Sequence, residues 1–173
     1  NRATAISVMP WIITSQTIPI LALAPMIVVA LGSAGFSGLL PIAIISMYLS
    51  FFPVVVGMVK GLRSPESLEL DQMKTWSASG PQVLMKLRLP KSMPFFFTSL
   101  KLGMAAALVG AIVGELPSGG GGGLGFRMLS GSTFGNTLHI WSGLFSAAVL
   151  AASLITFIGI LQKVILKKMA LEL

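Results

Sequence analysis

The sequence has no cysteine, one histidine and five acidic residues among its 173 positions. Without cysteine the chain forms no disulfide, no thiolate metal site and no cysteine nucleophile. With a single histidine and so few carboxylates, a metal cluster or an acid–base pair has almost no side chains to draw on. We therefore expect neither catalytic residues nor a metal site in this chain.

Charge is also scarce, at 10% of residues, whereas 54% are hydrophobic. A soluble domain carries about 25% charged residues, and a soluble core of this size cannot bury so many apolar side chains. The apolar side chains that the core cannot bury are therefore expected to face lipid. We predict an all-α, polytopic transmembrane helical bundle. The net charge of +7 is spread between and after the apolar runs rather than along one stripe, so we expect no nucleic-acid partner.

Four apolar stretches have about the 20 residues that a membrane-spanning helix needs. Prolines inside the first two predict bent helices. The chain begins with Asn1 rather than Met, and apolar sequence follows almost at once. We expect an N-terminally truncated fragment that is a single transmembrane domain over residues 1–173. The predicted spans cover residues 11–31, 39–59, 93–113 and 140–160.

The positions of lysine and arginine predict the orientation of these spans. Eleven of the twelve basic residues, with Lys101 counted at the edge of the central loop, flank one side of a four-span bundle. Only Arg127 lies between the last two spans. The excess of basic residues marks the cytoplasmic side. We expect cytoplasmic termini, a cytoplasmic loop over 60–92 and an external glycine-rich loop over 114–138.

The cytoplasmic loop is predicted to hold two short helices. The first begins at Ser64-Pro65-Glu66, where an N-cap residue, a helix-starting proline and an acid follow one another, and runs to about Trp76. Small turn-forming residues at 77–81 break it, and a second helix spans 82–87. The apolar side chains of such a projection either fill a groove on a partner or pack on the chain's own bundle.

The loop also resembles the coupling loop of binding-protein-dependent ABC importer permeases. In that family the loop reads Glu-Ala-Ala, three residues, Gly and later Leu-Pro; here Asp71 stands for the glutamate and Ser77 for the glycine, ahead of Leu89-Pro90. The resemblance implies docking to a cytoplasmic ATP-binding subunit. The residues that it assigns to this coupling are Asp71, Gln72, Met73, Trp76, Ser77, Ala78, Leu89 and Pro90.

Residues 15–25, 114–117 and 123–125 are similar to permeases for nitrate, sulfonates, taurine and pyrimidine precursors. Such permeases have about six spans, so the resemblance implies that two are absent here. It further implies the type I ABC importer fold, the bacterial inner membrane, a second permease copy and an external substrate-binding protein. It implies a small anionic or heterocyclic solute, such as a riboflavin-like compound, and no cofactor in this chain, because the partner ATPase binds ATP.

Three polar residues are candidates for the translocation path. Gln16 and Thr17 lie in the first predicted span, where they line a path or bond to neighbouring helices. Glu115 is the acid at the external end of a span, and it either functions there or is merely solvated. Gly120, Gly122 and Gly125 match the dinucleotide fingerprint only formally, because no strand precedes them. The alternatives to an ATP-driven permease are an ion-gradient-driven secondary transporter or channel, and a membrane-embedded enzyme.

Overall fold

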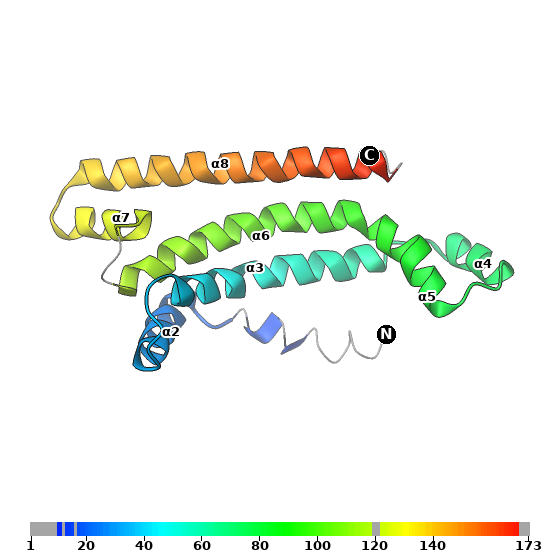
Figure 1. Ribbon diagram of the computed structural model, residues 1–173, viewed down its shortest axis with the longest axis horizontal. Helices are drawn as coiled ribbons and strands as arrows, with labels where there is room; N and C mark the ends of the chain where they lie inside the picture. The colour runs from blue at the N-terminus through cyan, green and yellow to red at the C-terminus, as the bar shows by residue number, and fades with distance from the viewer. Residues whose placement is uncertain (1–9, 12, 16, 119–121, 170–173) are drawn as a thin grey trace. The chain divides into compact units, whose positions relative to one another are not determined.

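The computed structural model describes residues 10–169 except 12, 16 and 119–121. Within these residues every regular element is a helix (Figure 1). The all-α prediction is therefore confirmed.

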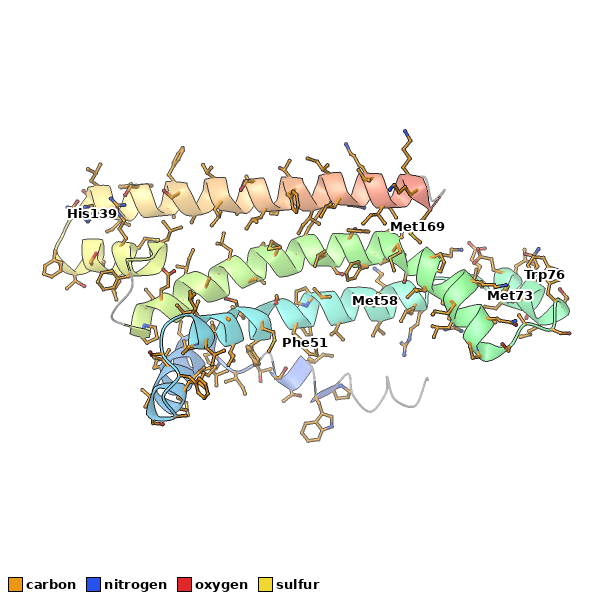
Figure 2. All side chains as sticks on the ribbon, viewed as in Figure 1. Phe51, Met58, Met73, Trp76, His139 and Met169 are labelled. Atoms are coloured by element: carbon orange, nitrogen blue, oxygen red, sulfur yellow. The ribbon has the colours of Figure 1, made fainter. Side chains whose placement is uncertain are left out.

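Three helices are long and apolar enough to cross a membrane among the described residues. They are α3 (Leu39–Leu62), α6 (Leu89–Ser118) and α8 (Thr137–Lys168), and each contains one of the predicted spans. In their most apolar segments only 6% to 22% of residues are buried inside the chain. Side chains project along the whole length of all three helices, and His139 lies near the start of α8 (Figure 2). Most of their surface is thus left for lipid or for other chains.

The first predicted span is wrong as a single helix. The structure begins α2 (Ile20–Ser33) immediately after Pro19, which is its N-cap in extended conformation. Proline has no N–H to donate, and it disfavours helical conformation in the residue before it. At 14 residues, α2 rises about 21 Å, short of the roughly 30 Å of a bilayer core. Among the described residues, α2 is thus a shorter apolar helix beside the three that are long enough to span a membrane.

The chain divides into two compact units. The described residues within 1–52 and 103–154 form the first. In it, α3 and α6 touch at two glycines four positions apart: a Cβ on Gly110 would lie 2.7 Å from the Cα of Ser46, and one on Gly114 would lie 3.2 Å from the Cα of Ile42. Paired small residues of this spacing let membrane helices approach closely.

The first unit also contains α7 (Leu124–Thr133), a helix inside the segment predicted to be a glycine-rich loop. The predicted loop boundaries at 114 and 138 fall inside α6 and α8, which extend to Ser118 and back to Thr137. Glycine density indicated irregular backbone, whereas glycine at 123 and 125 instead allows α7 to begin against the side chain of Glu115.

The described residues within 53–102 and 155–173 form the second unit. Here the paired glycines are on α3: a Cβ on Gly61 would lie 2.9 Å from the Cβ atoms of Ser92 and Phe95, and one on Gly57 would lie 2.5 Å from the Oγ of Ser99. Each unit therefore contains one close approach of α3 to α6 made by glycines. This second unit carries the polar segment that contains the candidate site.

Candidate functional site

The candidate site is a helical projection that we call the α4–η1 knob, residues 67–88. It consists of α4 (Ser67–Thr75), α5 (Gly80–Val83) and the π-helix η1 (Leu84–Arg88), which continues directly into α6. The sequence predicted the knob's two helices and the turn between them. The structure changes where each begins and ends.

The N-cap of the first helix is Glu66 rather than Ser64. The Glu69 carboxylate accepts a hydrogen bond of 2.8 Å from the backbone N–H of Glu66, and Glu66 is the N-cap residue. A carboxylate three residues into a helix that binds back to the cap is the reciprocal half of a capping box. This contact explains why the helix starts two residues later than the Ser-Pro-Glu pattern predicts.

The first helix ends in a Schellman motif at Ser77. The N–H of Ala78 donates to the carbonyl of Met73, and the N–H of Ser77 donates to the carbonyl of Lys74, which are the two bonds that define this motif. Ser77 has a positive φ of 52°, a conformation that glycine adopts most easily. The structure thus gives a physical reason for a glycine at this position in the coupling-loop pattern.

The second helix does not stop before Leu89-Pro90, contrary to the sequence expectation. Pro90 cannot donate a hydrogen bond, and its ring crowds the carbonyl four residues earlier. The wider turn of η1 accommodates the ring of Pro90 and its missing donor, because the N–H of Leu89 donates to the carbonyl of Leu84, five residues back. The chain therefore stays helical, without interruption, from the knob into the membrane-spanning helix α6.

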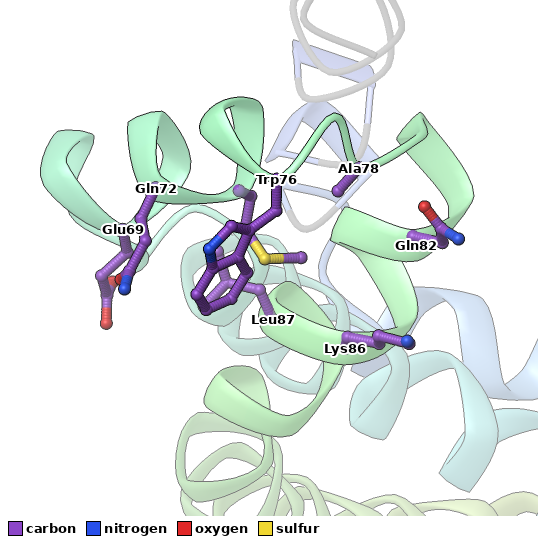
Figure 3. A pocket seen from close by; sticks show the side chains of 8 residues that line it. Glu69, Gln72, Trp76, Ala78, Gln82, Lys86 and Leu87 are labelled. Carbon is purple, nitrogen blue, oxygen red and sulfur yellow. The ribbon is translucent and has the colours of Figure 1, made fainter.

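We call α4 the first arm of the knob, and α5 with η1 the second arm. An open hollow of about 450 Å³ lies between the two arms. Trp76 lies across it, with Gln82 and Lys86 on the opposite arm (Figure 3). Met73 forms the buried floor at 8% exposure, whereas Trp76 is 68% and Leu68 76% exposed. The lining residues are Glu69, Gln72, Met73, Trp76, Ala78, Gln82, Lys86 and Leu87.

Of the predicted coupling residues, the hollow brings together Gln72, Met73, Trp76 and Ala78. The others lie apart from it. Asp71 forms an exposed ion pair of 2.7 Å with Lys74, Ser77 makes the turn, and Leu89 and Pro90 begin α6. Glu69, Gln82 and Lys86 were not predicted, because only the fold brings the two arms together.

Two polar contacts attach the knob to the spanning helices. Lys91 of α6 lies 2.5 Å from the Glu69 carboxylate of α4, and Arg88 donates a 3.3 Å hydrogen bond to the carbonyl of Leu62, the last residue of α3. The hydrogen bond from Lys91, with that from the Glu66 backbone, holds the pKa of the Glu69 carboxyl below its ordinary value. The first arm of the knob is therefore held by charge to α6, and the second to the end of α3.

Thr17 and Glu115, two of the three predicted path residues, each have a local hydrogen-bond partner in the structure. Gln16 lies outside the described residues, and the Thr17 hydroxyl donates 2.7 Å to the carbonyl of Thr14 within its own segment. Glu115 accepts a 2.6 Å hydrogen bond from the N–H of Gly125, in the first turn of α7. A carboxylate at a helix N-terminus complements its unpaired N–H groups and its dipole. Glu115 thus has a local structural partner, a reading that the sequence did not offer.

These features define a multi-pass helical membrane protein whose longest polar segment is folded into a knob. Residues 1–171 match the family described as the binding-protein-dependent transport system inner membrane component. The chain belongs to this family, and the resemblance found in its sequence is confirmed.

Several relatives have been assigned names. A probable ABC transporter permease protein of Haemophilus influenzae is 33% identical, covering 75% of this chain and 51% of the relative. The formylaminopyrimidine transport permease ThiX of Halalkalibacterium halodurans is 33% identical over 66% of this chain and 44% of its own. The putative aliphatic sulfonates permease SsuC of Bacillus subtilis is 25% identical, covering 96% and 59%. The chain thus spans about half the length of these relatives.

Proposed function

We propose that this chain is part of the permease subunit of an ATP-driven importer, and that the α4–η1 knob docks on a separate cytoplasmic ATPase subunit. The observation that carries the proposal is the combination of an exposed apolar tip with firm attachment at the base. Trp76 and Leu68 present large apolar side chains outward, while Lys91 and Arg88 tie the knob to α6 and α3.

The chemistry of the tip suits a protein partner. Tryptophan beside a hollow is the kind of anchor that dominates interface energies. Exposed charges around it, Asp71 and Lys74 among them, supply a polar rim. The coupling residues expected from the sequence fall on this knob or directly after it, from Asp71 to Pro90.

Family membership supports proposals for the remaining parts of the assembly. We propose a second permease copy, an external substrate-binding protein, and ATP binding and hydrolysis by the partner alone. The proposed location is the bacterial inner membrane, with the knob cytoplasmic, because Lys and Arg gather there. The names of relatives that act on formylaminopyrimidine and aliphatic sulfonates support a small heterocyclic or anionic solute.

The proposal is tested by co-purifying the full-length protein with its candidate ATPase subunit. Ser77→Asp puts a charge at the tip but keeps a residue that tolerates positive φ, whereas Ser77→Gly keeps the turn without the charge. We expect Ser77→Asp to lose the ATPase and Ser77→Gly to retain it. Trp76→Ala should weaken binding by about 2 kcal/mol or more, whereas Trp141→Ala on α8, equally exposed at 67% against 68%, should not.

A wild-type protein that binds no ATPase would refute the docking role. Uptake that collapses with an ionophore while ATP is held constant would instead support an ion-gradient-driven transporter.

A further inference from the structure

Lys101 lies deep inside a membrane-spanning helix. It is twelve positions beyond Leu89, where α6 begins (101 − 89), or about 18 Å along the axis. The helix over 80–117 is long and apolar enough to cross a membrane, and Lys101 lies eight positions inside the span predicted at 93–113 (101 − 93), beyond the cytoplasmic loop to whose edge it had been assigned. An ionisable side chain at this depth is costly and marks functional sites.

No acidic side chain of the described residues pairs with Lys101. Glu69 and Asp71 form ion pairs with lysines of the knob and of α6. Glu115 is bonded to the first turn of α7. Lys101 makes no hydrogen bond to any residue that the structure describes, so its positive charge has no counterpart in this part of the chain.

A second unpartnered polar group lies one helical turn from the residue of α8 that Lys101 approaches. The Cε and Nζ atoms of Lys101 both lie 3.8 Å from where a Cβ on Gly159 of α8 would be. Gln162, one turn further along the same face of α8, is 7% exposed, and its amide makes no hydrogen bond within the described residues. A buried amide without a partner is rare in folded proteins.

We propose that Lys101 and Gln162 form an anion site in the translocation path, one that takes the sulfonate or carboxylate group of a small solute. An ammonium and an amide N–H are both donors, and an oxyanion accepts from both in charge-assisted bonds. The low dielectric of the membrane interior strengthens the attraction. Gly159, without a side chain, leaves space beside the ammonium. The inference rests on the proposed permease function and assigns the anionic class of solute to it.

The test uses one introduced cysteine, with any cysteine outside this cysteine-free sequence replaced first. Gln162→Cys is introduced into the full-length complex with its ATPase and binding protein, in phosphatidylcholine nanodiscs with ATP. Its reaction with a methanethiosulfonate that carries a sulfonate is compared with that of one that carries a trimethylammonium group. We expect the sulfonate reagent to react about tenfold faster or more, the effect of one charge-assisted hydrogen bond, and free ethanesulfonate to slow it.

Matched variants isolate the role of the ammonium. Lys101→Met should abolish the preference for the sulfonate reagent, and Lys101→Arg should keep it. Lys163→Met, which removes the exposed lysine next to Gln162, should leave it unchanged. If Gln162→Cys fails to assemble, Gly159→Cys, beside Lys101, carries the same comparison.

A thiol that reacts with neither reagent during ATP turnover would overturn the site, because no solute then reaches it. Equal rates with both reagents, or a preference that survives Lys101→Met, would overturn it as well. Protection by added phosphatidylglycerol but not by ethanesulfonate would assign the anion to a lipid headgroup and refute the solute. Failure of the permease function would be seen separately, as a wild-type complex without ATP-dependent uptake.

Discussion

The close approach of α3 to α6 at Gly110 predicts a graded response to one added methyl group. In Gly110→Ala the new Cβ would lie 2.7 Å from the Cα of Ser46, 3.1 Å from its nitrogen and 3.2 Å from the carbonyl oxygen of Ile45. All three atoms are backbone, so no rotamer change relieves the contact, and the helices must separate. Overpacking of this kind costs about 1–3 kcal/mol, of which the better helix propensity of alanine offsets up to about 1.

The net loss of up to about 3 kcal/mol corresponds to a fall in Tm of up to about 12 °C, measured by thermal unfolding in detergent. Gly114→Ala should cost less, because its nearest contact is 3.2 Å. Gly32→Ala, in α2 with nothing within 4 Å, should be neutral or stabilising. The Tm should be highest for Gly32→Ala, lower for Gly114→Ala and lowest for Gly110→Ala. Any other order of Tm would refute this account of the α3–α6 contact.

Three further predictions concern the knob and α7. Lys91→Met should speed amide hydrogen exchange in α4. Because the contact with Lys91 lowers the pKa of Glu69 from 4.5, the protection in the wild type is complete above that value and fades as pH falls through the lowered pKa. Exchange in the two proteins should therefore converge in acid, and divergence there would contradict the ion pair. Ser77→Gly relieves a positive φ of 52° and should stabilise the protein by up to about 1 kcal/mol, and a lower Tm would argue against the left-handed turn. Glu115→Gln weakens the bond to Gly125 and should expose the first-turn amides of α7 to exchange, at a cost of about 1 kcal/mol; unchanged exchange would show that α7 begins without this carboxylate.

The long helices were predictable because the bilayer reduces the problem to length and hydrophobicity. The predicted spans 39–59 and 140–160 lie inside α3 and α8, and each helix extends past them into polar sequence. Proline was the main source of error, and in both directions. Pro19 interrupts a helix that the apolar run favours, since α2 begins only after it. Pro90 and Pro94 lie inside α6, where hydrophobicity alone cannot distinguish a helix break from a tolerated kink.

The candidate site was predictable only in its local parts. The turn around Ser77 follows from small residues in sequence, but Glu69 and Lys91 are 22 positions apart, and Arg88 and Leu62 are 26 apart. Contacts at such separations depend on how α3 and α6 pack, which no periodic pattern encodes. The same reason hid Lys101, since its distance from Gly159 is set by α8, far along the chain.

The way the knob is attached bears on how it would transmit force if it docks as proposed. Its first arm is joined by Glu69 to Lys91 of α6, and its second arm is itself the beginning of α6, with Arg88 reaching α3. Below these contacts, Gly61 keeps α3 against Ser92 and Phe95, so bending the knob alone would break several contacts at once. A partner that moves the knob would therefore displace this end of α3 and α6 together, which carries the motion along α6 toward Lys101, ten positions beyond Lys91 (101 − 91).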